Sequence, residues 1–391
     1  MLRLFLLLIP AILYSQKGYS YPNFIGKGYH ACLTCHYNPF GNGPLNDYGR
    51  GVAASGIAGR LFIGDKTSDE KLSNRSGFFF NKSDKNSIIK PAFDYRGASL
   101  RRQLETDEPT EKYINMQMDT SITAEWGAQK KYVASFTLSV VPSNSLPAGS
   151  KAYDVEEGED LIFAKELYLG MRLSPSTRAY FGKMDKVFGI RVPDHTAYSR
   201  LITGNTQYGS TYGAVFHMGM EKFDFGAQAF LGDFEKIEES RTQGFSTKYE
   251  HSLTDNTRAG LSLSRETNFT DDVITAYALH SKTGIGKGSS LMFEFGRVAT
   301  AQKGLDPVTQ QYIFLQNHYY ITRGLYFLTT YEQYIADTSG ASEAHNFAPG
   351  IQYFPFQRLE FRAEIINSKQ YATNISAKDT WTYLGQIHLW F

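Results

Sequence analysis

The sequence predicts an all-β fold, a transmembrane antiparallel β-barrel of about sixteen strands over residues 90–391, preceded by a small segment at 21–60. Three observations predict it. Stretches of alternating polar and apolar side chains run for about 9–14 residues, whereas soluble strands are usually about 5–6 residues long. Short turns alternate with longer polar loops near 102–111, 142–159, 186–209, 232–240 and 368–378, as they do at the two rims of an outer-membrane barrel. The chain also ends in an alternating aromatic strand.

This last strand is the most specific of the three observations. Counted back from Phe391, every second residue through Trp381 is apolar or Gly, and Thr382, Gln386 and His388 lie in the intervening set. One face could therefore meet lipid and the other a polar lumen. The ending resembles the C-terminal signal of bacterial outer-membrane barrels, a terminal Phe on an alternating aromatic strand. An ordinary amphipathic strand that ends in Phe is the alternative.

The composition is compatible with a membrane barrel. Aromatic residues make up 15% of the chain, with 26 Tyr and 28 Phe, and the aromatic girdles of a barrel would account for them. The formal net charge is +1, which implies no strong attraction to nucleic acid. In residues 358–365, Leu, Phe, Ala and Ile alternate with Arg and Glu, a pattern that a soluble sandwich and a barrel would share.

The amino terminus predicts export. Residues 1–15 read MLRLFLLLIPAILYS, with one early arginine followed by a short apolar run. The run is too short to span a bilayer stably and has the build of a signal peptide, which we place at residues 1–20 with cleavage after Ser15 or Ser20. A retained anchor helix is the alternative, and Pro10 and the short run argue against it.

The residues Cys32-Leu33-Thr34-Cys35-His36 form the pattern C-x-x-C-H, which is typical of c-type haem attachment. Two thiols at this spacing would add to the vinyl groups of one covalent haem c, and His36 would be the proximal ligand of the iron. These are the only two cysteines in 391 residues. Export through a signal peptide agrees with such an attachment.

Three other interpretations of the cysteines remain open. A redox C-x-x-C pair would need a βαβ pattern around it, and none is visible. A zinc site would need two more Cys or His ligands at short spacing, and only His30 is nearby. A disulfide across two intervening residues would be strained. We therefore expect covalent haem.

The segment at 21–60 is rich in Gly, Asn and Tyr, and it is too small to bury a large apolar core unless the haem staples it. A short helix is expected over 45–58, and residues 61–89 are expected to be a linker. His30 is the nearest candidate for the distal iron ligand, although its place two residues before Cys32 makes the reach awkward. A lumen His or Met, or an open site, are the alternatives.

The longest loop, at about 186–209, follows the fifth expected strand. In position it resembles the third loop of sixteen-stranded porins, which folds inward to narrow the pore, and residues 181–190 resemble phosphate-selective porins. This resemblance implies a charged constriction, where rings of charge would set selectivity. Its candidate residues are Arg191, Asp194, His195 and Arg200. A solvated extracellular loop is the alternative.

The haem motif and the barrel ending together resemble porin–cytochrome proteins of Gram-negative bacteria, in which a barrel lets a c-type cytochrome pass electrons across the outer membrane. The resemblance implies a location in the bacterial cell outer membrane, with lipid around the barrel. An even strand number would put both termini, and so the haem segment, on the periplasmic side. The chain departs from the usual arrangement because one haem sits on the barrel chain itself. One haem cannot bridge a hydrocarbon core of about 30 Å, so a periplasmic or multihaem cytochrome is the expected partner.

Three hypotheses follow from the sequence. The first is a haem-bearing outer-membrane porin that takes part in electron transfer. The second is a diffusion porin whose haem segment serves as a plug, gate or redox sensor, and the third is a structural barrel with a haem-stabilised periplasmic foot. We do not expect an enzyme, although an open haem site could act on peroxide or another small ligand. A homotrimer is an expectation by analogy with sixteen-stranded porins alone.

Overall fold

The computed structural model describes residues 22–61, 67–104, 108–146, 148–194, 196–340, 342–372 and 375–391. The expected signal peptide at 1–20 and the candidate constriction residue His195 lie outside the described residues.

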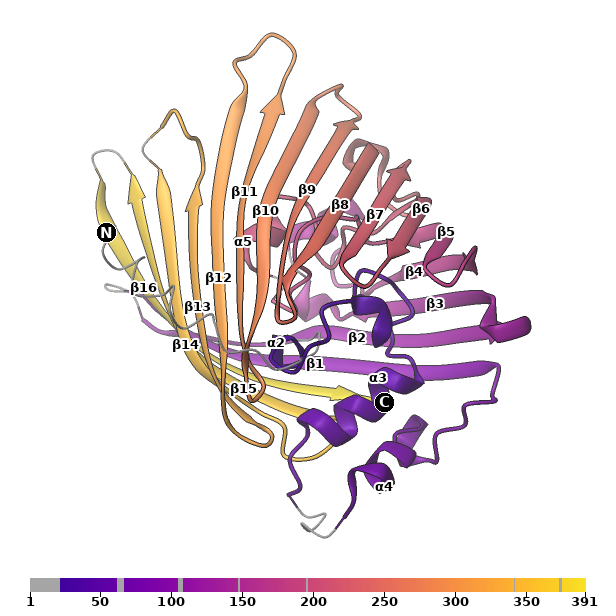
Figure 1. Cartoon of the computed structure of the whole chain (residues 1–391). Coiled ribbons are helices and arrows are strands. Elements are labelled where there is room, and N and C mark those ends of the chain that lie inside the picture. Colours follow the sequence, from indigo (N-terminus) through magenta and orange to yellow (C-terminus); the bar gives the residue numbers. More distant parts are fainter. Residues whose placement is uncertain are drawn as a thin grey trace.

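In the described part of the chain, sixteen strands form one closed barrel in which each strand pairs with its neighbours in sequence, and β1 pairs antiparallel with β16 (Figure 1). The predicted fold class and strand number are therefore confirmed. The strands are β1 (Ile89–Leu104), β2 (Thr110–Trp126), β3 (Tyr132–Val141), β4 (Leu161–Arg172), β5 (Thr177–Met184), β6 (Thr211–Gly219), β7 (Phe223–Phe230), β8 (Thr242–Thr254), β9 (Thr257–Asn268), β10 (Val273–Gly286), β11 (Ser289–Ala301), β12 (Val308–Thr322), β13 (Leu325–Ile335), β14 (Glu343–Tyr353), β15 (Leu359–Ala372) and β16 (Ile375–Trp390).

Short helical elements accompany the barrel. They are α2 (Pro22–Ile25), η2 (Cys32–Thr34), α3 (Asp47–Val52), η3 (Ala53–Ile57), α4 (Asp69–Asn74), η4 (Phe78–Phe80), η5 (Ala128–Lys130), η6 (Ser143–Ser145), η7 (Ala148–Ala152), α5 (Tyr198–Leu201) and η8 (Glu238–Ser240). Helix α3 and the π-helical turn η3 lie within the helix expected over 45–58. The expected linker at 61–89 contains α4 and η4 in its described part. Among the described helices, none has the length and apolar character needed to cross a membrane.

The barrel is apolar outside and polar inside. In β15, Phe361 and Ile365 are each 44% exposed, whereas Glu360, Arg362 and Glu364 are buried. This is the expected alternation with lipid outside and a polar lumen inside, because a soluble barrel would bury the apolar set instead. The fully buried side chains of the wall include charged ones such as those of Glu166 and Lys183, so the lumen is lined with polar groups.

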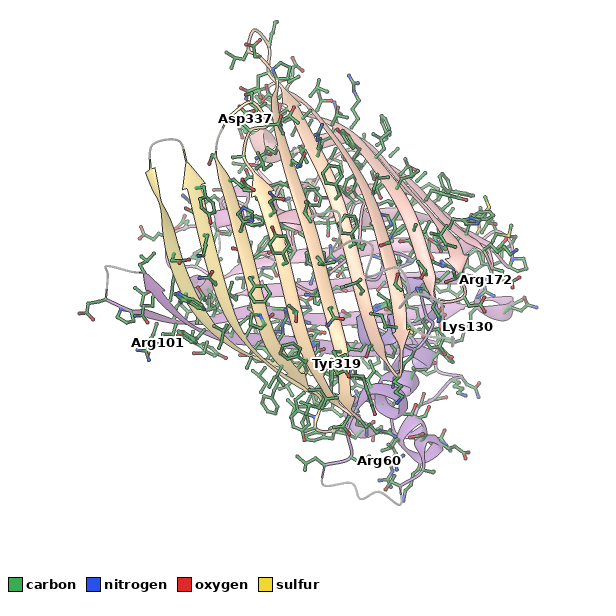
Figure 2. The ribbon with its side chains drawn as sticks, turned by 60° about the vertical axis from the view of Figure 1, so that its left-hand side comes forward. Arg60, Arg101, Lys130, Arg172, Tyr319 and Asp337 are labelled. Carbon is green, nitrogen blue, oxygen red and sulfur yellow. The ribbon has the colours of Figure 1, made fainter. Side chains whose placement is uncertain are left out.

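The two ends of the barrel differ in the length of their connections. The turns at 255–256 and 323–324 are short, while the connections at 185–210 and 231–241 at the opposite end are long. Asp337 and Arg60 mark these two ends, with Asp337 at the long-loop end and Arg60 at the short-turn end (Figure 2). A long loop expected over 368–378 is largely strand, since β15 extends to Ala372 and β16 begins at Ile375.

The segment that carries the C-x-x-C-H motif enters the lumen at the short-turn end (Figure 1). Helix α2 contacts β10, β11 and β12. The side chain of Asn23 donates to Oε1 of Gln352 on β14 at 3.1 Å, and the amide of Asn38 donates to Oε1 of Glu166 on β4 at 2.7 Å. Arg50 donates to the carbonyl of Pro91 on β1 at 3.3 Å. These contacts fix the segment to widely separated strands of the wall.

The exposure of the apolar outer face predicts that a charged side chain placed on it lowers the stability of the barrel. Leu279 on β10 is 57% exposed. Leu279→Arg should lower the free energy of unfolding by about 2–4 kcal/mol, because an arginine near the bilayer midplane has to leave water. Denaturant unfolding in lipid bilayers would measure the loss. Leu305→Arg, in the loop between β11 and β12, is the control and should change little, and equal effects of the two changes would contradict a lipid-facing β10.

Candidate functional site

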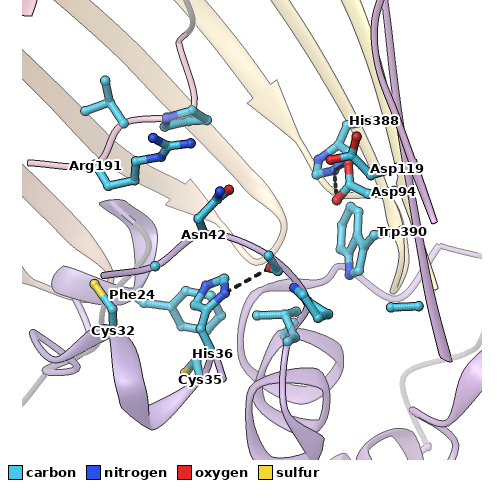
Figure 3. A pocket seen from close by; sticks show the side chains of 18 of the residues that line it. Phe24, Cys32, Cys35, His36, Asn42, Asp94, Asp119, Arg191, His388 and Trp390 are labelled. Carbon is cyan, nitrogen blue, oxygen red and sulfur yellow. Dashed lines mark hydrogen bonds and ion pairs between the residues drawn. The ribbon is translucent and has the colours of Figure 1, made fainter. Parts of the chain in front are cut away.

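The C-x-x-C-H motif folds as a single tight turn. The amide of Cys35 donates to the carbonyl of Cys32 at 3.0 Å, and the amide of His36 donates to the same carbonyl at 2.9 Å. A turn of this kind brings both thiols and the imidazole to one region of the cavity wall, as Figure 3 shows. Both cysteines are free thiols. Burial raises the pKa of Cys32 and raises that of Cys35 to about 12, so both thiols are held neutral.

The orientation of His36 leaves one ring nitrogen for a metal. Its Nδ1 lies 3.2 Å from the carbonyl oxygen of Gly43, and because a carbonyl can only accept, Nδ1 carries the proton and donates it. Nε2 is then the nitrogen with a free lone pair. Burial lowers the pKa of His36 to about 4, which keeps the ring neutral. A neutral imidazole with its second nitrogen bonded to a carbonyl is the usual state of a metal-ligating histidine.

The residues after the motif build the pocket for this turn. Gly43 has a φ of 67° and lies so close to Glu166 that an added Cβ would be 2.1 Å from its Oε2. A Cβ at Gly49 would lie 2.3 Å from the carbonyl oxygen of Cys35. The side chain of Asn46 donates to the carbonyl of Thr34 at 3.1 Å and accepts from the amide of Gly49 at 2.8 Å.

These residues were not assigned a role from the sequence. The sequence feature that could have pointed to them is the Gly- and Asn-rich run directly after His36. Its glycines allow the backbone to fold back and pack closely against the turn.

A cavity of about 240 Å³ lies between this turn and the barrel wall. In Figure 3, Cys32, Cys35 and His36 lie on one side of the cavity, and His388 and Trp390 lie across it. The apolar part of the lining includes Phe24, Ile57, Met292, Phe354, Trp390 and Phe391. The charged part includes Arg191, Arg200, Lys248, Lys282, Asp94 and Glu360.

This mixture of lining groups fits a haem, which has an apolar macrocycle and two carboxylate groups. Cys32, Cys35 and His36 supply the two thiols and the imidazole that haem c requires. Among the described residues, no group of three or more His, Cys, Asp and Glu side chains is placed to hold a metal ion by themselves.

His30 also lines the cavity and is 7% exposed. Neither of its ring nitrogens makes a hydrogen bond of ordinary geometry. Burial and the charge of Lys282 lower its pKa to about 3, so the ring is neutral. The carbonyl of His30 accepts a hydrogen bond from Nζ of Lys282 at 3.2 Å, which fixes the backbone of this residue to β10.

Two residues of the barrel wall, Met292 and His388, are further candidates for the distal ligand. Met292 on β11 is buried and lines the same cavity. His388 on β16 lines it too, but both its nitrogens face carboxylates, with Nδ1 2.9 Å from Glu360 and Nε2 3.1 Å from Asp94. Binding iron would require His388 to give up one of these bonds, whereas neither ring nitrogen of His30 is held by a hydrogen bond of ordinary geometry.

The connection between β5 and β6, residues 185–210, folds into the lumen. The amide of Val187 donates to Oε1 of Gln228 on β7 at 3.0 Å, and the amide of Gly189 donates to Oγ of Ser262 on β9 at 3.0 Å. Farther along, the amide of Tyr198 donates to Oε1 of Glu332 on β13 at 2.8 Å. The loop therefore crosses from one wall of the barrel to another.

The structure gives the predicted constriction residues different environments. Arg191 and Arg200 both line the cavity. Arg191 pairs with Asp185, and Arg200 donates to the carbonyl of Val192 at 2.9 Å. Asp194 is turned to the wall, where its two oxygens accept from Arg362 at 2.6 and 3.2 Å. The two arginines thus line the same cavity as the C-x-x-C-H motif, and the aspartate anchors the loop.

Comparison with known proteins gives the fold and no closer relationship. No family model matches the chain, and no curated protein matches it. Among solved structures, a loop L8 deletion mutant of OmpT, an outer membrane protein of Vibrio cholerae, aligns with a TM-score of 0.59 at 10% identity, covering 78% of this chain and all of that one. OprB of Pseudomonas putida aligns with a TM-score of 0.57 at 9% identity, covering 86% and 100%.

An anion-selective porin from Comamonas acidovorans aligns with a TM-score of 0.56 at 10% identity, covering 78% of this chain and 99% of the porin. The chain thus has the closed sixteen-stranded barrel fold of outer-membrane porins.

The tight turn makes covalent haem a testable expectation. Cys32→Ser combined with Cys35→Ser should abolish haem that stays with the polypeptide in denaturing electrophoresis, because no other cysteine can form the thioethers. Expression in a host with cytochrome c maturation machinery and haem staining would measure it. Heat-modifiable mobility should persist in the variant, which shows that the barrel still folds. Covalent haem on the double variant would contradict the assignment.

The ion pair between Asp194 and Arg362 predicts that losing it loosens the inward loop at 185–210. Asp194→Ala would leave Arg362, whose side chain is 5% exposed, without its bidentate partner. Arg362 keeps its ion pair with Glu364 at 2.7 Å, so the loss should cost about 1.5–3 kcal/mol, as for a hydrogen bond to a charged group. We expect hydrogen exchange of the amides at 187–190 to speed up by tenfold or more. Asp306→Ala, on an exposed loop, is the control, and protection at 187–190 equal to that of the unmodified protein would contradict the anchoring role.

Proposed function

We propose that this chain is a haem-bearing, porin-like protein of the bacterial outer membrane that takes part in electron transfer at or across that membrane with a partner cytochrome. The observation that carries the proposal is the C-x-x-C-H turn inside the lumen, with the neutral ring of His36 oriented by Gly43 beside a cavity that has apolar and charged walls. When bound, haem c supplies a one-electron Fe(III)/Fe(II) couple.

Each group of the site has a defined part in holding the cofactor. Cys32 and Cys35 would hold it by two thioethers, each formed by adding S–H across one vinyl C=C with no leaving group. His36 would bind the iron through Nε2, and we propose His30 as the distal ligand. The apolar side chains of the segment and of the barrel rim would exclude water from the macrocycle, which changes the environment of the iron and therefore its potential.

The location of the site implies a partner. Short turns are periplasmic in outer-membrane barrels, so the haem segment would lie in the periplasmic half of the lumen. Lipid would surround the apolar outer face. One haem in that position leaves much of the roughly 30 Å hydrocarbon core unspanned, and a periplasmic or multihaem cytochrome would supply the other steps. A trimer form is known for OmpT of Vibrio cholerae, and a homotrimer of this chain is proposed on that likeness.

The alternative is a diffusion porin in which the haem segment is a plug, gate or redox sensor. The attachment of the segment to β1, β4 and β14 supports a plug. The same contacts argue against free diffusion, because the segment and the inward loop both occupy the lumen. A gate would have to break several buried hydrogen bonds, each worth about 1 kcal/mol, before solute could pass.

One experiment separates these functions. The purified holoprotein should show a haem that is reversibly reduced by dithionite and reoxidised by ferricyanide, together with a conductance in planar bilayers far below that of an open porin. We expect the conductance to be the same in both redox states. A porin-sized conductance that switches with redox state would favour the gate, and a protein without covalent haem would refute both roles of the cofactor.

The variant His30→Ala tests distal ligation in the same preparation. A ferric spectrum that changes from low-spin to high-spin, with covalent haem retained, is the expected result. An unchanged low-spin spectrum would exclude His30 and leave Met292 and His388 as the lumen candidates.

A further inference from the structure

Next to Phe391, which lines the cavity, the chain exposes the aromatic side chains of Phe79 and Phe80 to solvent. We propose that Phe79 and Phe80, with the basic residues around them, form the docking surface for an acidic, soluble one-electron carrier protein, and that Phe391 joins this surface to the haem cavity. The inference rests on the proposed function and identifies the surface through which electrons would leave or enter the site.

The aromatic contact is continuous from the cavity to the surface. Phe391, the last residue of the chain, lines the cavity together with Trp390. The ring of Phe79 stacks on that of Phe391, with centroids 4.7 Å apart and an interplanar angle of 28°. The ring of Phe80 meets Phe391 edge to face at 5.7 Å. Phe79 is 58% exposed and Phe80 is 44% exposed, so the contacts of these rings with Phe391 extend from a residue that lines the cavity to solvent.

The backbone holds these rings outward at an energetic cost. Phe79 has a φ of 48° and Phe80 a φ of 63°, a left-handed conformation that disfavours side chains by about 1–2 kcal/mol per residue. The turn is closed by the amide of Gly77, which donates to the carbonyl of Asn81 at 2.9 Å. The guanidinium of Arg358 lies over the rings of Phe80 and Phe391, at 5.3 and 5.6 Å from their centroids, and donates to the carbonyl of Gly77.

Strain of this kind points to a use for the exposed rings. Gln129 and Lys130 adopt the same left-handed conformation in the short connection between β2 and β3, whereas at Phe79 and Phe80 it exposes two large apolar rings. Exposing two phenylalanines to water is unfavourable by itself, and a partner that covers them would recover the free energy of burying apolar surface.

The exposed charges in the same segment of the chain as the rings indicate the charge of the partner. Arg75, Lys82 and Lys85 are exposed in the same segment, and Asp84 is the one exposed carboxylate between residues 75 and 87. Three cations and one carboxylate leave a local charge of +2. A carrier with an apolar contact region inside an acidic rim would complement this surface, and opposite charge accelerates its encounter.

Anionic lipid headgroups also attract basic residues, but the contacts favour a protein. Phe79 and Phe80 pack on Phe391, which is one of the residues that line the cavity. The patch thus lies by the mouth of the lumen, beside the site whose electrons a carrier would exchange.

The test is the reduction rate of the oxidised holoprotein in detergent micelles. One donor is flavodoxin hydroquinone, an acidic one-electron carrier protein, and the other is dithionite, which needs no docking surface. Phe79→Asn with Phe80→Asn removes both rings with residues that accept positive φ, so the turn is retained. We expect the second-order rate constant with flavodoxin to fall at least tenfold and the rate with dithionite to stay the same. Phe269→Asn, an exposed phenylalanine at the opposite end of the barrel, is the control.

The charge contribution is tested separately with Lys82→Glu combined with Lys85→Glu. At low ionic strength this variant should also react at least tenfold more slowly with flavodoxin, and the decrease of rate with added salt should reverse or vanish. The exposed Lys303→Glu is its control and should behave as the unmodified protein does.

Each remaining outcome has a distinct meaning. Equal flavodoxin rates in the unmodified protein and both double variants would overturn the docking surface while leaving the redox function intact. Equal rates together with weaker binding of the variants to vesicles containing phosphatidylglycerol would assign the patch to lipid and likewise overturn the inference. A haem that dithionite fails to reduce in the unmodified protein would instead refute the proposed function.

Discussion

The structure depends on one requirement, that every backbone N–H and C=O inside a bilayer must find its hydrogen-bond partner within the protein. Sixteen strands meet it only because β1 pairs with β16, with Tyr95 opposite Leu389 and Gly97 opposite Ile387. Closure removes the sheet edges and creates an inside. Since side chains alternate along each strand, an apolar outer face obliges the inner face to take the polar residues. The lumen is therefore a polar enclosure in which buried charges can be paired.

That enclosure allows a small segment without its own core to be held in place. Asn38 reaches Glu166, which is 128 positions away, and Asn23 reaches Gln352, which is 329 positions away. These polar contacts act together with apolar clusters that the segment shares with the wall, such as Phe24 and Ile57 packed with Tyr326, because about forty residues could not build a core alone. The inward loop completes the enclosure, because Asp194 is bound to Arg362 while Arg191 and Arg200 face the cavity. The wall, the loop and the segment thus share one network, and the cavity is the space left between them.

Local patterns in the sequence predicted the parts of this arrangement that are set by local chemistry. The alternation around Phe361 and Arg362 predicted a strand with two unlike faces, because burial acts on each residue separately. The C-x-x-C-H motif predicted two thiols and an imidazole close enough to serve one haem, and the structure holds these three residues on one tight turn. The prediction was wrong for residues 368–378, where polar residues suggested a loop, since strand pairing continues beyond the lipid and needs no apolar face there. Nor could the sequence distinguish Asp194 as an anchor from Arg191 as a lining residue, because their partners come from distant strands.

The place of the motif within the barrel constrains what the chain can do. A segment attached outside the lumen would leave the pore free, and diffusion and redox chemistry could then coexist. Here the residues that orient His36 and those that cross the lumen belong to the same forty-residue stretch, so opening a path for solute would disturb the site. A porin needs a wet, open lumen, whereas a haem pocket needs a packed and largely dry one. The contacts of this segment are compatible with the second requirement, and on that ground we propose electron transfer rather than diffusion.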